Sequence, residues 1–358
     1  MKNKMQHNNQ KNDMKWHDPK EFPFQLNGFA WLETDKIYRR FPVNPIKKLP
    51  TRVDELANST SGGQIRFKTD ANKLAIKVKL SGPADMSHMT AVGQCGFDVY
   101  LKEGGKHSYI STAIPPLNVT NYESVLWDFI STSNHLREAI INFPLYQGVE
   151  EVLIGTEASA VVHPPTPYIS DKRVIFYGSS ITQGACASRP GMSYTNILSR
   201  RFNLEFINLG FSGSGKGERE VALSIREIER PGCLVLDFEA NSTVEQYKTR
   251  LLPFIKLFRE YHPTVPIIVA SRIPYAKFFN EDQNQSILRK RNISISSVAK
   301  LQQEGDERIT FLDGSLLLGE GWHECTVDGV HPNEYGFMKM ADGFESILRS
   351  SLKSAGIL

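Results

Sequence analysis

The chain has 358 residues, of which 23% are charged, and a formal net charge of +3 at pH 7. This length exceeds one ordinary core and predicts about two domains. The small net charge argues against a nucleic-acid partner and against attachment to an anionic membrane. No apolar run reaches the roughly 18 to 20 residues that a membrane span requires.

Residues 1–15 are polar, and no apolar stretch follows their positive charges, so we expect a disordered tail and no signal peptide. The four cysteines are widely separated and form no CxxC pair: Cys95, Cys186, Cys233 and Cys325. This usage predicts a cytoplasmic protein with free thiols. Cys186 could line a site built around Ser180, although a small buried apolar role is commoner for cysteine.

Residues 16–162 have the pattern of a β-sandwich domain, jelly-roll-like in type. Short segments alternate apolar and polar side chains, as half-buried antiparallel strands do. The clearest are Gln64–Thr69, Lys73–Leu80 and Phe97–Lys102. A linker over residues 163–172 follows, because three prolines among residues 163–167 block helix and strand pairing and favour a stiff connector.

Residues 173–358 alternate strand and helix, which predicts an α/β domain with a parallel sheet of about five strands. The expected strands are Val174–Tyr177, Phe206–Leu209, Leu234–Phe238, Ile267–Ala270 and Thr310–Leu312. Helices are expected around residues 194–202, 243–261 and 282–303, and a closing helix over 333–349. Ligands bind such sheets at the carboxyl ends of the strands, which is where we look for chemistry.

Ser180 follows the first of these strands, in Gly178-Ser179-Ser180-Ile181-Thr182-Gln183-Gly184. A serine at a strand-to-helix turn exposes its hydroxyl next to backbone N–H groups, which suits a nucleophile that must stabilise an oxyanion. The alternative is that Ser180 is only the N-cap of the helix. The segment is not the GxSxG elbow of α/β-hydrolases, because its second glycine comes too late.

Asp328 and His331 stand just before the last helix, with Asn333 as its expected N-cap. Their three-residue spacing can bring a carboxylate against an imidazole Nδ1, which orients the ring for work as a base. A surface loop with an ordinary histidine is the alternative, since DxxH arises often by chance. A metal site formed with His323 and Glu324 is a third interpretation, although the spacing is not that of HExxH.

Two further segments follow the second and third strands. Gly213 lies in the run Gly210–Gly215, whose glycines permit positive φ and leave N–H groups uncovered. Asn241 closes the third strand, and its amide can donate to an oxyanion from a rigid position. Each alone is more often structural, as a turn or a cap.

Taken together and in this order, the four segments resemble the SGNH (GDSL-like) hydrolase superfamily, which is named for a Ser, a Gly, an Asn and a His in such blocks. The resemblance covers about residues 173–349 and implies a flavodoxin-like, three-layer α/β domain. The segment Gly96-Phe97-Asp98-Val99-Tyr100 is similar to the GxDLY signature of the N-terminal β domain in a bacterial two-domain subgroup.

This resemblance implies a role for each block. Ser180 would be the nucleophile, His331 the general base and then acid, and Asp328 the residue that orients His331. The Ser180 amide, the Gly213 amide and the Asn241 side chain would form the oxyanion hole. The chain departs from the wider family in having Ser179 where aspartate is usual and residues 238–241 where GxND is usual, which leaves substrate preference open.

The expected function is therefore hydrolysis of short-chain acyl esters, with an acetylated carbohydrate or a similar small alcohol as substrate and no cofactor or metal. Transfer of the acyl group to another alcohol is one alternative, and an inactive carbohydrate-binding protein on a hydrolase fold is another. The sequence leaves a homo-oligomer open. Four aromatic residues of the β domain could stack on a sugar, although core packing is their commoner role: Trp31, Tyr100, Tyr109 and Trp127.

Overall fold

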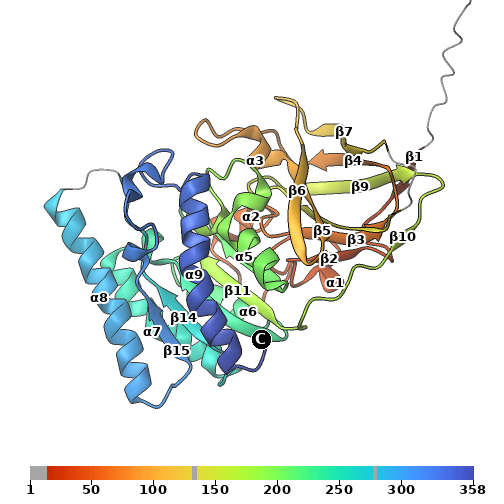
Figure 1. Ribbon diagram of the computed structural model, residues 1–358. Helices are drawn as coiled ribbons and strands as arrows, with labels where there is room; N and C mark the ends of the chain where they lie inside the picture. The colour runs from red at the N-terminus through yellow and green to blue at the C-terminus, as the bar shows by residue number, and fades with distance from the viewer. Residues whose placement is uncertain (1–13, 131–134, 277–279) are drawn as a thin grey trace, which may run out of the picture.

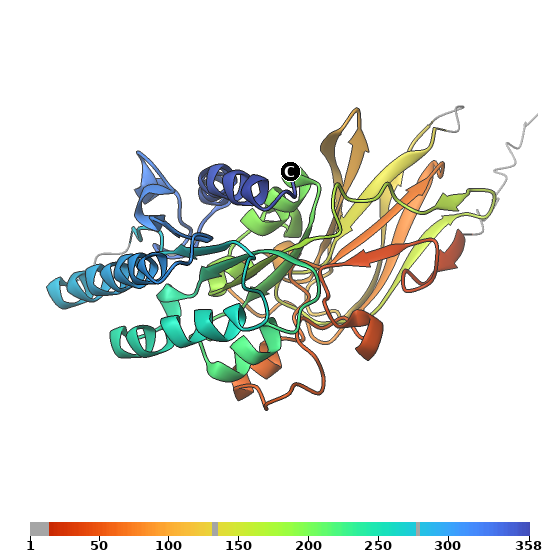
Figure 2. The ribbon, with the colours of Figure 1, turned by 90° about the horizontal axis from the view of Figure 1, so that it is seen from below.

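The computed structural model describes residues 14–130, 135–276 and 280–358. A β domain and an α/β domain lie side by side (Figures 1 and 2). The tail expected over residues 1–15 lies outside the described residues except for Met14 and Lys15, which belong to a strand instead. Four residues are too few to reveal an alternating pattern, so only the pairing with a distant strand defines this element.

Two antiparallel sheets form the β domain. The first has the order β1-β9-β4-β7, and the second has the order β10-β3-β8-β5-β6 with β2 added on β3. The strands are β1 (Met14–His17), β2 (Gln25–Asn27), β3 (Gln64–Thr69), β4 (Lys73–Leu80), β5 (Phe97–Glu103), β6 (Lys106–Ala113), β7 (Asn121–Asp128), β8 (Arg137–Asn142), β9 (Val149–Glu157) and β10 (Val162–His163). Three short helices connect them: α1 (Leu32–Asp35), α2 (Thr51–Leu56) and α3 (Ala91–Cys95).

The alternation in these strands explains the packing of this domain. Ile65 and Phe67 of β3 and Leu74 and Ile76 of β4 are fully buried in one core. Each strand thus turns one face to the partner sheet, as in a sandwich. His163 was expected in the linker but pairs with Lys68 at the end of the second sheet.

The α/β domain has one parallel sheet with the order β12-β11-β13-β14-β15. Its strands are β11 (Arg173–Gly178), β12 (Glu205–Gly210), β13 (Pro231–Asp237), β14 (Ile267–Ala270) and β15 (Ile309–Leu312). Its helices are α4 (Ser180–Gln183), α5 (Tyr194–Phe202), α6 (Arg219–Ile225), α7 (Val244–Arg259), α8 (Glu281–Gln303) and α9 (Glu334–Ser354), with short 3₁₀ turns at Pro190–Met192, Glu239–Asn241, Gly314–Leu316 and Trp322–Glu324. This is the flavodoxin-like strand order.

Successive residues of each strand enter different cores, so both faces of the sheet are covered. Ile175 and Tyr177 of β11 pack with α6, α7 and α8, whereas Val174 and Phe176 pack with α5 and α9. Figures 1 and 2 show helices on both sides of this sheet. The predicted fold class, a three-layer α/β domain with five parallel strands preceded by a β-sandwich, is confirmed.

A fully buried arginine joins the two domains. Arg40 donates through Nε to the Ser59 carbonyl and through Nη2 to the Leu56 carbonyl, both at 2.7 Å, within its own domain. Its Nη1 donates across the junction to the carbonyl of Gly210 at the end of β12. The guanidinium carbon also lies 4.6 Å from the ring centroid of Phe211. Arg40 therefore fixes the end of β12 against the β domain.

The segment that resembles GxDLY makes a second connection between the domains. Asp98 is fully buried, and its Oδ2 accepts from Arg189 Nη1 at 2.7 Å and from the Gly191 amide at 2.8 Å. Its Oδ1 accepts from Asn142 Nδ2 at 2.8 Å. The Tyr100 hydroxyl accepts from the same Arg189 nitrogen. The motif thus binds the segment that follows α4 in the other domain.

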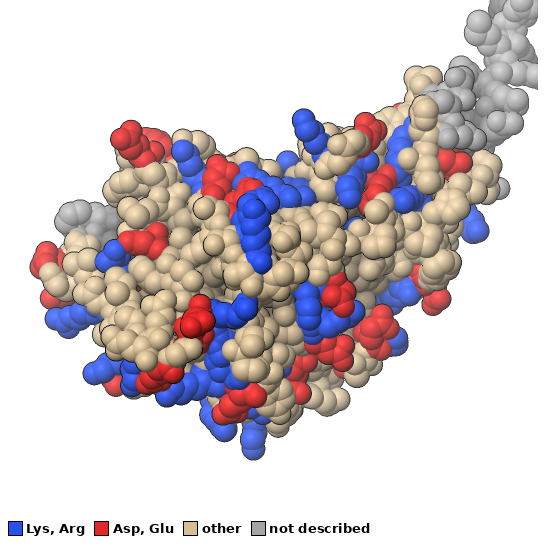
Figure 3. All heavy atoms as spheres, turned by 60° about the horizontal axis from the view of Figure 1, so that its bottom comes forward, with Lys and Arg blue, Asp and Glu red and all other residues tan. Residues whose placement is uncertain are grey.

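Charges of both signs are interspersed over the face drawn in Figure 3, as the small net charge predicts. Among the residues that the structure describes, no helix combines the length and the apolar character needed to cross a bilayer. All four cysteines are buried and free.

Candidate active site

Ser180 lies at the first position of α4, directly after β11. The N-cap of this helix is Ser179, whose hydroxyl accepts from the Ile181 amide at 3.2 Å. The interpretation of Ser180 as the N-cap is therefore wrong, because its neighbour fills that position. The Ser180 hydroxyl is therefore not used to cap the helix.

The structure brings Ser180, His331 and Asp328 into contact in series. Ser180 Oγ lies 2.9 Å from His331 Nε2, and His331 Nδ1 lies 2.7 Å from Asp328 Oδ2. The other oxygen, Asp328 Oδ1, accepts from the amides of His331 at 2.8 Å and Val330 at 3.0 Å. Burial alone would raise the pKa of Asp328, but these hydrogen bonds from His331 and Val330 lower it to about 2.

This series has a definite chemical capacity. An ionised carboxylate at Nδ1 holds the imidazole with Nε2 toward the hydroxyl, so Nε2 can take the hydroxyl proton while the carboxylate stabilises the imidazolium. The serine becomes a nucleophile as it loses that proton. Asn333 caps the next helix, α9, by accepting from the Gly336 amide at 3.0 Å, which fixes the end of this loop.

The glycine loop after β12 lies against α4, because the Ser212 amide donates to Gln183 Oε1 at 3.0 Å. Gly213 has a φ of +61°, and a Cβ there would meet no heavy atom within 4 Å, so it borders open space. Gly210 is required by a close approach instead, because a Cβ there would lie 2.1 Å from the Gln183 amide nitrogen. Throughout residues 14–130, 135–276 and 280–358, no acceptor contacts the amide of Ser180 or of Gly213. Both are therefore available to a ligand.

In this structure the Asn241 side chain holds the glycine loop. Its Nδ2 donates to the carbonyl of Phe211 at 3.0 Å and to the carbonyl of Ser214. Both amide hydrogens are thus used to hold the glycine loop. Donation from Asn241 to an oxyanion requires one of these two bonds to be exchanged.

Asp237, which the sequence did not single out, lies at the end of β13 and is hydrogen-bonded to α4 and α5. Its Oδ2 accepts from the Thr182 hydroxyl at 3.0 Å and from the Tyr194 hydroxyl at 2.8 Å. Burial raises the pKa of this carboxyl to about 7, although the hydrogen bonds from Tyr194 and Thr182 act in the opposite direction. An aspartate at the end of a buried strand carries no pattern that would have marked it.

We expect the free energy of unfolding of the wild type to fall relative to that of Asp237→Asn as the pH rises from 5 to 8. A pKa of about 7 in the folded state, against roughly 3.9 in the unfolded chain, means that the folded state binds the proton more tightly. The contribution of this carboxyl to the free energy of unfolding is fully present below about pH 4 and is lost as the pH rises through about 7. Asparagine has no such proton to lose.

Urea unfolding of both proteins at several pH values measures this difference. Between pH 5 and pH 8, the free energy of unfolding of the wild type should fall relative to that of Asp237→Asn by about 3 kcal/mol, because about two pH units separate pH 5 from the folded pKa of about 7. A difference that stays constant between pH 5 and pH 8 would contradict the prediction.

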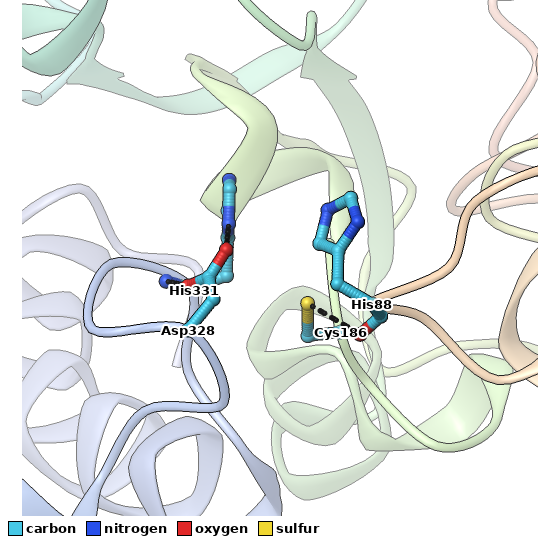
Figure 4. Close-up of side chains that lie close together, drawn as sticks. All are labelled: His88, Cys186, Asp328 and His331. Carbon is cyan, nitrogen blue, oxygen red and sulfur yellow. Dashed lines mark hydrogen bonds and ion pairs between the residues drawn. The ribbon is translucent and has the colours of Figure 1, made fainter.

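The β domain also reaches the site. The Tyr146 hydroxyl donates to the Ser180 carbonyl at 3.3 Å. The ring of His88 lies 5.6 Å from the ring of His331, centroid to centroid, and the carbonyl of His88 accepts from Cys186 Sγ at 3.2 Å. Figure 4 shows His88 entering from the β domain, opposite the loop that carries His331. Nothing in the sequence around residue 88 indicates this contact, because it depends on how the domains pack.

The remaining predictions about side chains had mixed outcomes. In the described part of the chain, the cluster that could hold a metal includes Asp328 and His331, joined by His88 and Cys186 and not by His323 and Glu324.

The four aromatic residues of the β domain that could stack on a sugar differ in exposure. Trp127 and Tyr100 are buried, whereas Trp31 is half-buried against a core and Tyr109 is 44% exposed and stacks on Arg189. Three of these four aromatic residues thus serve packing.

Each of the two domains matches a known protein family. Residues 171–349 match the GDSL-like Lipase/Acylhydrolase family, and residues 14–162 match the family described as the N-terminus of SGNH-hydrolase-type esterases. The comparison with curated proteins gave no match.

Three of the solved structures that resemble this chain illustrate the likeness. A protein of Bacteroides ovatus ATCC 8483 described as a GDSL-like lipase is 30% identical, with a TM-score of 0.87 over 95% of this chain and 98% of that one. The salicylyl-acyltransferase SsfX3 of a tetracycline biosynthetic pathway is 18% identical, with a TM-score of 0.74 over 96% and 98%. A family two carbohydrate esterase from Clostridium thermocellum, in complex with cellohexaose, is 15% identical, with a TM-score of 0.55 over 83% and 94%.

The last two structures have the fold in common with this chain. The Bacteroides ovatus protein and the two family matches show membership of a family and not only a common fold. Those matches extend over both domains and include Ser180, Asp328 and His331. The chain belongs to the GDSL-like lipase/acylhydrolase family and carries the N-terminal domain of SGNH-type esterases.

Proposed function

We propose that this protein is a serine esterase that hydrolyses short-chain acyl esters, acetyl esters in particular, on a carbohydrate or a similar small alcohol. The observation that carries the proposal is the series of contacts from Ser180 Oγ to His331 Nε2 at 2.9 Å and from His331 Nδ1 to Asp328 Oδ2 at 2.7 Å. Membership of an acylhydrolase family supports the same reaction class.

In the first step Ser180 Oγ forms a bond to the ester carbonyl carbon as its proton passes to His331 Nε2. The bond from that carbon to the alcohol oxygen then breaks, and His331 returns the proton to the departing alcohol. In the second step a water molecule attacks the acyl-enzyme and gives a proton to His331. The carboxylic acid leaves, and Ser180 regains its proton.

The negative charge on the tetrahedral oxygen needs donors that are already in place. The free amides of Ser180 and Gly213 serve as the first two donors. The side chain of Asn241 is the third, once it exchanges its bond to Phe211 or Ser214 for one to the oxyanion. Loss of one such donor costs about 10² to 10³ in kcat.

The carbohydrate part of the proposal is supported by likeness of fold. Family two carbohydrate esterases share both domains with this chain, and one of them was crystallised with cellohexaose. Acyl transfer is the second candidate, because a salicylyl-acyltransferase resembles the chain over 96% of its length. Incubation of an acetyl ester with and without an added alcohol, followed by mass analysis, separates the two: hydrolysis gives acetate in both, and transfer gives a new ester.

Labelling with a fluorophosphonate tests the nucleophile and the reaction class together. Wild-type protein should gain the mass of one phosphonyl group, and Ser180→Ala should gain none. Ser212→Ala, which removes another hydroxyl within the glycine loop, is the matched control and should label like the wild type. Absence of labelling, together with inertness toward 4-nitrophenyl acetate, would favour an inactive carbohydrate-binding protein.

A further inference from the structure

Four metal-ligating side chains from three segments meet at the junction of the two domains. They are His88 of the β domain, Cys186 of the segment after α4, and Asp328 and His331 of the loop before α9 (Figure 4). One possible ligand atom from each lies within 4.8 Å of the others. Only two of these residues take part in the proposed hydrolysis. His88 and Cys186 have no role in it.

The chemistry of this set suits zinc. Imidazole nitrogen, thiolate sulfur and carboxylate oxygen are the three ligand types that Zn²⁺ takes in proteins. Bond lengths of roughly 2.0 to 2.3 Å place the ligand atoms of a tetrahedral site roughly 3.3 to 3.8 Å apart. The most widely separated ligand atoms must therefore approach by at most about 1 Å. His88 has the freedom to do so, because its side chain is exposed and its ring nitrogens make no hydrogen bond within the described part of the chain.

The backbone around this cluster is already held in place. The Thr90 hydroxyl donates to the Ser188 carbonyl at 2.7 Å, which ties the loop of His88 to the segment of Cys186. The Ser188 amide in turn donates to the Glu334 carboxylate at 2.6 Å, at the start of α9. The three segments thus keep their spacing without a bound ion, and only side chains need to move.

We propose that His88 and Cys186, with His331 and Asp328, form an inhibitory Zn²⁺ site that blocks the hydrolase. The inhibitory effect rests on the proposed function, because the ion takes a lone pair of His331 and the carboxylate of Asp328 and so removes both the base and the group that supports it. The Cys186 thiol gives its proton to solvent on binding, since a coordinating thiol is deprotonated outright. No redox step is involved.

The first test measures binding without catalysis. Ser180→Ala protein, stripped with a chelator, is titrated with ZnCl₂ by calorimetry, and one ion per chain is expected. Adding His88→Ala or Cys186→Ser to this background should weaken the affinity at least about tenfold, because even the loss of a residue that only supports a ligand costs 10- to 100-fold. His323→Ala removes a nearby exposed histidine outside the cluster and is the matched control. It should bind like the parent.

The second test measures inhibition of the otherwise wild-type enzyme, with each variant compared with its own metal-free activity. Zn²⁺ should inhibit the wild type and His323→Ala at the same concentration, and His88→Ala should need at least about tenfold more. Equal binding by the parent and by His88→Ala would overturn the site whether or not the protein is an esterase. Activation by Zn²⁺ would overturn the inhibitory role. Tight binding in a protein that hydrolyses no ester would leave the site standing and count against the proposed function.

Discussion

Replacing His331 with alanine is expected to lower kcat for 4-nitrophenyl acetate by roughly 10⁶-fold, as loss of the base does in other serine hydrolases. Among the described side chains, the imidazole is the only group hydrogen-bonded to Ser180 Oγ, so no other base is in position to take its place. Asp328→Asn should cost about 10⁴, because an amide at Nδ1 favours the wrong tautomer of the ring. Steady-state kinetics measures both losses of kcat, and circular dichroism checks that each variant is folded.

The two losses should not add. Once His331 is gone, Asp328 has no ring to orient, so the double variant should match His331→Ala alone. His323→Ala is the control for a missing histidine, since its side chain is 62% exposed and its activity should stay at the wild-type level. A His331→Ala protein that keeps its kcat within tenfold would show that Ser180 is not activated in this way.

Replacing Asp98 with alanine should lower the free energy of unfolding by about 3 kcal/mol, at the lower end of the range for breaking a buried ion pair. The carboxylate is fully buried and accepts from Arg189, Gly191 and Asn142. Its removal leaves the Gly191 amide and Asn142 Nδ2 without an acceptor, and Arg189 Nη1 with the Tyr100 hydroxyl alone. The effect stays at the lower end because the Arg189 side chain is 19% exposed and recovers some hydration.

Urea unfolding measures this loss, and Asp128→Ala is its matched control. Asp128 also belongs to the β domain and pairs with Lys73 at 3.2 Å, but its side chain is 62% exposed. An exposed pair of this kind contributes about 0 to 1 kcal/mol. If Asp98→Ala proved no less stable than Asp128→Ala, the segment around Asp98 would not be what joins the domains.

The parts of the fold that could be predicted are those with a repeating pattern. Alternation in Lys73–Leu80 predicts a half-buried strand, and the apolar run Ile267–Ala270 predicts a strand buried on both faces. The contact of Asp328 with His331 was predictable for another reason, since three residues across a turn suffice to bring them together.

The contacts between domains could not be predicted in this way. His88 stands 243 positions before His331, in a loop without periodicity, and only the packing of the β domain brings the two rings together. Asn241 shows a second limit. Residue type indicates that an amide can donate, but the direction of donation depends on the carbonyls of Phe211 and Ser214, which the sequence does not locate.

The buried Arg40 has a consequence for how the chain folds during synthesis. Its acceptor at Gly210 lies 170 positions later in the chain, and ribosomes add about 5 to 20 residues per second. The last strand of the β domain begins at Val162, 48 positions before Gly210, so the complete β domain waits roughly 2 to 10 seconds before this guanidinium finds its partner across the junction. Throughout that interval the surface that later faces β12 is uncovered, so the N-terminal half released on its own should be prone to aggregation.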